Sequence, residues 1–230
     1  AGDFIFRPGP VFANVILGEE INRASPKTQA ALLEAMEESQ VTVDARTRTL
    51  GPPFIVIATH NPIEHDGTYP LPEAQLDRFM MRLTMGYPIR TKELEMLDTH
   101  GERSTFEDLR PVVHAEDIVR MSEIAQHIHV ADVLKGYIIY IAEANRSAPD
   151  LMLGASPIAS LYLPRAARTT AVIAGRDYVA PDVVKRIIGP VLNHRLIVRP
   201  EAQMRGVGVD QILEGVANSV AVPGTRVAAR

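Results

Sequence analysis

The chain has 230 residues, of which 46% are hydrophobic and 23% charged, and its net charge at pH 7 is −4. This length and composition are typical of a soluble globular protein with one large domain or two small ones. The chain has no cysteine, which excludes a disulfide framework and thiolate metal sites. Because it also has no apolar run near the ~18 residues of a membrane span and no signal-peptide pattern at its start, we expect a cytoplasmic protein without a membrane span.

The charge is unevenly distributed. Residues 151–230 hold ten Lys and Arg against five Asp and Glu, which leaves fourteen against twenty-three of the totals of 24 and 28 for the residues before them. The basic end could attract nucleic acid, but its arginines are scattered among apolar residues with few aromatic neighbours. A solvated helical face is the favoured interpretation, and nucleic acid is not an expected partner.

The first ninety residues combine strand and helix signals. A helix beginning at Ser25-Pro26 is predicted, with Ser25 as its cap, and a second, short helix is predicted over Glu73–Phe79. The alternation from Gln40 to Arg48 predicts a β-hairpin closing around Asp44-Ala45-Arg46. The segments expected to form further strands, two of them buried, are Phe4–Phe6, Val11–Leu17, Phe54–Thr59 and Met81–Met85.

From Thr91 onward the pattern is helical and strand signals nearly vanish. The predicted helices are Glu93–Thr99, Ala115–His127, Ala131–Ala144, Ile158–Gly175 and Pro181–Leu192. Pro164 lies inside one of them and is expected to kink or divide it. The sequence therefore predicts an α/β front joined to an all-helical back.

Polar residues follow both predicted buried strands. Glu19 and Glu20 follow Val11–Leu17, and one such carboxylate can hold Mg²⁺ while the next activates water for hydrolysis of a nucleotide. Asn61 follows Phe54–Thr59, and its amide would lie beside the acids if the strands are parallel neighbours. Taken alone, the acids are a weak signal that is also typical of a strand leading into a charged turn, and Asn61-Pro62 is typical of a turn initiator.

Four segments point to a known family: GPVFANVILGEEINRASPKTQAALLEAMEE, ATHNPIEHDGTYPLPEAQLDRF, GRDYVAPDVV and PVLNHRLIVRPEA. Together they resemble the MoxR branch of the AAA+ ATPases, over nearly the whole chain and in the family's order. The resemblance implies an α/β fold class: an incomplete AAA+ P-loop core with a parallel sheet over residues 1–90, then an all-α lid domain over residues 91–230.

The resemblance also implies roles for individual residues, with ATP and Mg²⁺ as cofactors. Glu20 matches the Walker B glutamate that activates water, and Glu19 takes the place of the Walker B aspartate associated with Mg²⁺. Asn61 matches the sensor-1 asparagine beside the nucleotide. Arg78 matches a position from which a related clade supplies an arginine finger to the ATP of the neighbouring subunit; the alternative is a helix-surface pair with Asp77 or Glu73.

Three features depart from the family's pattern. No Gly-Lys pair occurs anywhere, and the family's phosphate-binding G-x-x-x-x-G-K-[ST] loop lies before the point where this chain begins. We therefore expect a truncation, and weak ATP binding or none by this chain alone. Glu19 replaces an aspartate, which is expected to slow hydrolysis. Ile158 stands where the family commonly has the sensor-2 arginine, so either another lid cation such as Arg165 substitutes for that arginine or the coupling between lid and nucleotide is weakened.

The missing loop also has a structural consequence. In the family's strand order, 5-1-4-3-2, this chain would hold strands 3, 4 and 5, with strand 5 separated from strand 4. We expect the front part to be unstable or to self-associate, whereas the lid could fold alone.

Two functions remain open from the sequence. The first is an ATPase that works as a homo-oligomeric ring, expected to be a hexamer in the full-length form, and couples ATP hydrolysis to chaperone-like remodelling or maturation of an unknown partner protein. The second is a truncated, catalytically inert interaction protein that acts through the lid.

Overall fold

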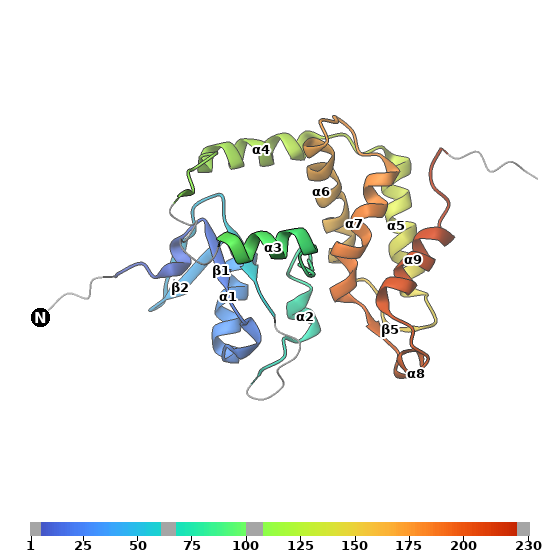
Figure 1. Ribbon diagram of the computed structural model, residues 1–230, viewed down its shortest axis with the longest axis horizontal. Coiled ribbons are helices and arrows are strands. Elements are labelled where there is room, and N and C mark those ends of the chain that lie inside the picture. The colour runs from blue at the N-terminus through green and yellow to red at the C-terminus, as the bar shows by residue number, and fades with distance from the viewer. Residues whose placement is uncertain (1–5, 61–67, 100–107, 225–230) are drawn as a thin grey trace, which may run out of the picture.

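A two-stranded parallel sheet and one helix form the centre of the α/β part, residues 6–80 (Figure 1). The computed structural model describes residues 6–60, 68–99 and 108–224. Strand β1 (Val15–Gly18) pairs with β4 (Ile55–Ala58) in the register Val15 to Ile55 and Gly18 to Ala58. Helix α1 (Pro26–Glu38) begins at Ser25, whose hydroxyl accepts a 3.3 Å hydrogen bond from the N–H of Thr28. The cap and the first-turn proline start the helix where the sequence predicts.

Helix α1 covers only one face of this sheet. Leu33 is buried with Ile21, and Ala58 of β4 packs against them. The other face carries four apolar side chains that are 49–58% exposed, those of Val15, Leu17, Ile55 and Ile57. Both strands are present, but the first is shorter than predicted: Val11 and Phe12 lie in a 3-10 helix, Pro10–Phe12, and the strand begins at Val15. Their prediction as buried strands is wrong, because the described residues cover one side of the sheet and leave the other open.

The predicted hairpin is confirmed. Strand β2 (Gln40–Val43) pairs antiparallel with β3 (Arg46–Thr49), so that Arg46 belongs to the strand and the turn has two residues. Both turn residues, Asp44 and Ala45, have positive φ, at 50° and 59°. This is the backbone of a two-residue turn whose twist matches that of the strands.

The predicted strand over Met81–Met85 is wrong, since the segment has no regular secondary structure and no ladder pairing. A strand forms only where a neighbour supplies backbone partners, and no strand of the described residues lies beside this one. Met85 is accordingly 97% exposed. Residues 4 and 5 of the predicted Phe4–Phe6 strand lie outside the described residues. Phe6 itself is not in a strand and packs its ring edge-on against that of Phe12.

A helical region, residues 108–224, lies beside the α/β part (Figure 1). Helices α5 to α7 and α9 enclose one large core of Leu, Ile, Val and Ala side chains together with Tyr137, drawn from residues 128–216. Proline at the first or second position begins α6, α7 and α8. The helices are α4 (Ala115–His127), α5 (Asp132–Arg146), α6 (Pro157–Ile173), α7 (Pro181–Leu192), α8 (Pro200–Met204) and α9 (Val209–Ser219).

Two details of the helical region differ from the prediction. Strands β5 (Leu151–Leu153) and β6 (Ile197–Val198) form a short antiparallel pair that the sequence pattern did not indicate. Helix α6 continues without division through Pro164.

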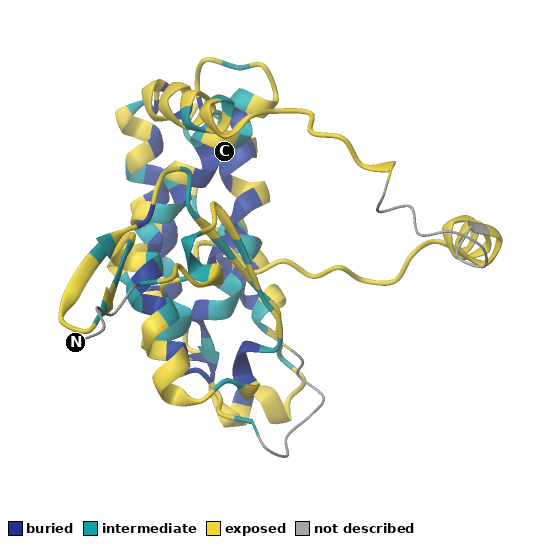
Figure 2. Cartoon of the chain, turned by 90° about the vertical axis from the view of Figure 1, so that its left-hand side faces the viewer, coloured by how far each residue is buried: buried dark blue, intermediate teal, exposed yellow. Residues whose placement is uncertain are grey.

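The α/β part ends shortly after α2 (Glu73–Leu76), which is shorter than predicted, and α3 (Arg90–Thr99) lies in the segment between the two parts. Figure 2 shows α3 away from the rest of the molecule, and its residues 90–98 are all exposed. No helix of the described residues is long and apolar enough to cross a membrane.

Candidate functional site

The two acids follow β1 at the edge of the sheet where β4 also ends. The parallel register pairs Gly18 with Ala58, so Glu19 and Glu20 begin at the same edge as Thr59. The N–H of Thr59 donates to the carbonyl of Gly18 at 2.9 Å, and the N–H of Ile21 donates to the carbonyl of Thr59 at 3.0 Å. The strands are therefore parallel neighbours, as the sequence interpretation required.

Glu20 has an uncommon backbone conformation, with φ 48° and ψ 52°. A non-glycine residue in this left-handed region costs free energy and persists only where the surroundings fix it. Here the N–H of Glu20 donates to the hydroxyl of Thr59 at 2.9 Å. Its carboxylate lies 3.1 Å from Nε of Arg23 in a half-exposed ion pair. The Glu19 side chain is exposed.

Buried hydrogen bonds support this turn from behind. The side-chain amide of Gln29, which is 2% exposed, donates to the carbonyls of Ile21 and Tyr69, each at 3.0 Å. The N–H of Tyr69 donates to the carbonyl of Asn22 at 2.6 Å. These contacts join the segment after the acids to α1 and to the chain that leads toward α2, which makes the turn rigid.

Asn61 lies outside the described residues, so its predicted place beside the acids stays a prediction. The last described residue before it, His60, is exposed and follows Thr59 at the edge of the sheet.

Arg78 is two residues beyond α2, and its side chain points toward α1. Its Nη2 lies 3.0 Å from Oε2 of Glu37, and the arginine side chain is 39% exposed. The alternative pairing with Asp77 or Glu73 is wrong: Arg78 pairs with another element. Glu37 lies in the last turn of α1. In the described structure Arg78 therefore forms its ion pair with α1, whereas Glu20 forms its own with Arg23.

Helix α6 approaches the segment around Arg78 with its first turns. Ser156 caps α6 and also donates to Oδ2 of Asp77 at 2.7 Å. Two residues later, Ile158 is 43% exposed. Arg165 is exposed and lies seven residues further along, close to two helical turns, and so on the same helix face. Ile158 and Arg165 thus share the face that carries Tyr162, whose hydroxyl donates to the carbonyl of Arg78 at 3.4 Å.

Comparison with known proteins agrees with this geometry. Residues 1–81 match the model of the "ATPase family associated with various cellular activities (AAA)", and residues 143–216 match the AAA lid domain. Uncharacterized protein YeaC of Bacillus subtilis is 45% identical over 99% of this chain, which spans 71% of that relative. Chaperone MoxR1 of Mycobacterium tuberculosis is 40% identical over 94% of this chain, which spans 59% of it.

A solved structure points the same way. The crystal structure of a putative ATPase from Cytophaga hutchinsonii is 36% identical and superimposes with a TM-score of 0.88, covering 94% of this chain and 68% of that one. The chain belongs to the MoxR family of AAA+ ATPases. Its fold is accordingly an AAA+ fold, with a parallel sheet flanked by helices and a helical lid domain.

The donor chemistry of a MoxR-family site fits Mg²⁺. Among the described residues, no group of three or more His, Asp or Glu side chains gathers in a way that could hold a metal ion. Mg²⁺ usually keeps several waters and is held by one or two carboxylates together with substrate phosphates. The exposed carboxylate of Glu19 at the strand edge matches that pattern, and the bound phosphates would supply the remaining ligands.

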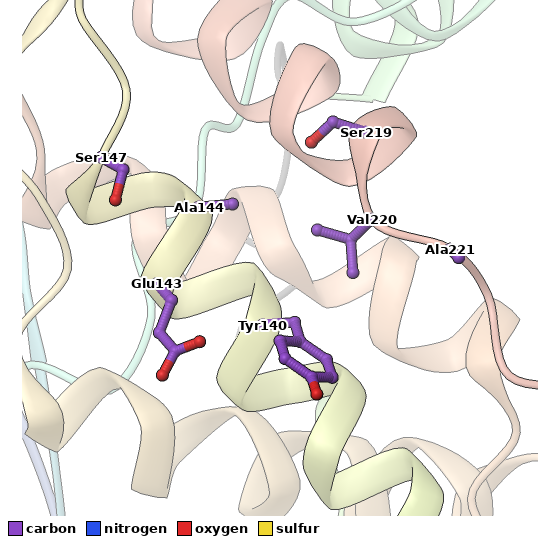
Figure 3. A pocket seen from close by; sticks show the side chains of 7 residues that line it. All are labelled: Tyr140, Glu143, Ala144, Ser147, Ser219, Val220 and Ala221. Carbon is purple, nitrogen blue, oxygen red and sulfur yellow. The ribbon is translucent and has the colours of Figure 1, made fainter.

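A hollow of about 460 Å³ lies elsewhere on this MoxR-family chain, between the ends of α5 and α9 (Figure 3). Tyr140, Glu143 and Ser219 lie along it, with small residues between them. None of Glu19, Glu20 and Arg78 lines this hollow, and we do not assign it to the nucleotide.

Thr59 and Gln29 are the supporting residues that sequence reasoning missed. Gln29 had a usable signal, since it lies four and seven residues before Leu33 and Met36, on the apolar stripe of the predicted helix. A polar residue on such a stripe predicts a buried hydrogen bond. Thr59 had none beyond its position at the end of a strand.

Proposed function

We propose that this chain belongs to a MoxR-type ATPase that couples ATP binding and hydrolysis to chaperone-like remodelling or maturation of a partner protein. In that ATPase it would supply the glutamates Glu19 and Glu20 of the nucleotide site, together with the lid. One observation carries the proposal: in a chain of this family, parallel pairing of β1 with β4 supports Glu19 and Glu20 at one edge of the sheet with Thr59. Ligands of open α/β sheets bind beyond the carboxyl ends of the strands, which is this edge.

In this proposal Glu20 is the general base. Its carboxylate accepts a proton from the water that attacks the γ-phosphate, and the rigid turn that begins with the Thr59 hydrogen bond fixes where that carboxylate reaches. In the structure the same carboxylate pairs with Arg23. A half-exposed ion pair contributes no more than about 1 kcal/mol, so releasing Glu20 for the water costs little.

Glu19 would contact the water shell of Mg²⁺, which when bound neutralises charge on the phosphates. Its side chain is one methylene longer than that of the aspartate usual in the family. Because Mg²⁺ requires near-ideal octahedral geometry, we expect hydrolysis to be slower than with aspartate. Asn61 would hold the γ-phosphate or the attacking water with a neutral amide.

Arg78 would act on the ATP of a neighbouring subunit in a ring, expected to be a hexamer. Its ion pair is with Glu37, while Glu20 of the same chain pairs with Arg23, which is compatible with action in trans. A cation at that point offsets the charge that develops on the transferred phosphoryl group. Arg165, on the same face of α6 as Ile158, would take the place of the sensor-2 arginine.

The test is Glu20→Gln in the full-length ATPase that carries a phosphate-binding loop. The amide keeps the size of the side chain but accepts no proton, so ATP turnover should fall by at least about 10²-fold while ATP still binds. Glu38→Gln, on the exposed side of α1, is the matched control and should leave both unchanged. Unaltered turnover in Glu20→Gln would overturn the assignment.

The inert alternative is favoured by Ile158, whose apolar side chain cannot contact phosphate. Calorimetry of the 230-residue chain with ATP and Mg²⁺ separates the two functions for the isolated chain. We expect weak binding or none; micromolar binding would exclude the inert interaction protein.

A further inference from the structure

The backbone of residues 77–80, which carries Arg78, is held by the helical region at every carbonyl. Arg195 donates to the carbonyls of Asp77 at 2.9 Å and Phe79 at 2.7 Å through Nη2, and to that of Met80 at 3.4 Å through Nη1. The hydroxyl of Tyr162 donates to the remaining carbonyl, that of Arg78. The carbonyls of four consecutive residues, 77 to 80, are therefore all hydrogen-bonded to the helical region, and Arg78 is one of these four residues.

Arg195 makes these contacts from inside the protein. Its side chain is 1% exposed, and its Nε lies 2.7 Å from Oδ1 of Asp77. The other carboxylate oxygen of Asp77 accepts from Ser156. The guanidinium also donates to the carbonyl of Val191 and lies over the ring of Tyr162, 5.0 Å from its centroid. A buried cation is stable only with such pairing and hydrogen bonding, so Arg195 and residues 77–80 move as one body.

We propose that Arg195 is the positioning residue for Arg78: by clamping Asp77 and the carbonyls around Arg78 to the helical region, it sets where the Arg78 guanidinium meets the ATP of the neighbouring subunit. The proposal rests on the proposed function of Arg78 as an arginine finger. It adds that the finger is aligned by a residue 117 positions further along the chain, in a different part of the fold.

Ser156 connects Asp77, and through it Arg78, with helix α6. Ser156 binds Asp77 and caps α6, and Ile158, in the sensor-2 place, lies two residues further in the same helix. A shift of α6 that follows the nucleotide state of one subunit therefore moves Asp77 and with it Arg78. The clamp thereby connects the nucleotide of one subunit with catalysis on the next one.

Arg195→Lys in the full-length ATPase tests the clamp. Lysine keeps the charge but loses the planar fork that reaches Asp77 and the carbonyls together. Because a displacement of about 1 Å at a positioned group costs about 10²-fold in rate, kcat should fall by roughly that factor while KM for ATP changes less than about twofold. Tyr140→Phe, on the exposed side of α5, is the control and should leave kcat unchanged.

Mixed rings distinguish positioning from general damage. A subunit with Arg195→Lys has an intact site but a displaced finger, whereas Glu20→Gln has an intact finger and no base. A one-to-one mixture of the two should regain activity at about a quarter of the interfaces in a head-to-tail ring. No regain would overturn the proposal, because the defect would then lie in the site of the Arg195→Lys subunit itself.

The same mixture with Arg78→Ala in place of Arg195→Lys tests the function on which the proposal rests. If it too regains nothing, Arg78 is not a finger in trans and the proposed function of Arg78 fails. If Arg78→Ala is complemented and Arg195→Lys is not, only the positioning role fails.

Two further variants test the clamp if the Arg195→Lys protein does not fold. Asp77→Asn removes the charge that faces Arg195 and keeps the shape of the side chain. Tyr162→Phe removes only the hydrogen bond to the carbonyl of Arg78. Both should lower kcat, Tyr162→Phe by a few-fold at most, and both should be complemented by Glu20→Gln; unchanged kcat in both would overturn the clamp.

Discussion

The hydroxyl of Thr59 accepts a 2.9 Å hydrogen bond from the backbone N–H of Glu20, so the residue that follows β4 fixes the turn that follows β1. This contact is one of the hydrogen bonds that stabilise the left-handed backbone at Glu20. It also means that the direction of the Glu20 carboxylate depends on a side chain 39 positions away in the sequence.

Thr59→Val should therefore impair turnover without abolishing ATP binding. Valine has the shape of threonine but no hydroxyl, so the N–H of Glu20 loses its partner. The net value of such a hydrogen bond is about 1 kcal/mol, and we expect kcat in the full-length ATPase to fall roughly five- to tenfold with KM little changed. Steady-state ATPase assays measure this. Thr49→Val, on the exposed hairpin, should have no effect; a rise in KM alone would contradict the role of Thr59.

The ion pair between Glu37 and Arg78 leads to a second prediction. Both side chains are more than a third exposed, so the pair contributes at most about 1 kcal/mol to stability. Glu37→Gln should leave the denaturant midpoint nearly unchanged. Because Arg78 no longer has an acidic partner in its own chain, turnover in the full-length ring should rise, by no more than about fivefold for 1 kcal/mol.

A matched variant checks the interpretation. Glu38→Gln changes the next residue of α1, whose carboxylate contacts Gln40 rather than Arg78, and should leave turnover unchanged. A fall in turnover for Glu37→Gln would show that the pair orients Arg78 for catalysis rather than holding it back.

Much of the fold follows from local sequence patterns. The bounds of α4 and α7 match the prediction residue for residue, because an apolar stripe at helical spacing defines each helix and a first-turn proline adds a start signal to α7. The hairpin followed from alternation. The prediction of a strand over Met81–Met85 was wrong because an apolar run shows the strand propensity of a segment but not whether a partner strand lies beside it.

The candidate site was predictable only in part. Glu19 and Glu20 and the parallel pairing of their strand follow from the order of motifs along the chain. The contacts that hold the site follow from no local pattern, because Arg195 meets Asp77 across 118 positions and Glu37 meets Arg78 between two elements. Such pairs depend on how the helices and strands pack against one another. The residue types and their spacing along the chain do not specify that packing.

His194 predicts a pH dependence of stability. Burial and the adjacent charge of Arg195 lower the pKa of His194 to about 4 from its ordinary value of 6.5. The folded state thus binds the proton more weakly than the unfolded state. The stabilisation is fully present above about pH 6.5 and is lost as the pH falls toward 4. The loss is at most about 3 kcal/mol, and smaller to the extent that solvent reaches the ring.

Urea unfolding of the chain at pH 7.5 and pH 5 measures this loss. His194→Gln has no titrating ring, so its free energy of unfolding should change less between the two pH values than that of the unaltered chain. His127→Gln, at the exposed end of α4, should keep the full dependence. Equal dependence in the unaltered chain and in His194→Gln would show that His194 is not the group responsible.

The helical region should fold without the α/β part. Its core is continuous over residues 128–216, whereas the buried cluster among the described residues of the α/β part is small and consists of Ile21, Leu33 and Leu71. A fragment of residues 108–224 should therefore unfold cooperatively in urea, as circular dichroism at 222 nm would show. Within it, Leu163→Ala empties a fully buried position and should cost about 2–5 kcal/mol, while Leu161→Ala, exposed on the same helix, should cost little. A gradual transition that neither substitution moves would mean that the core needs the contacts of Arg195 with residues 77–80 in order to form.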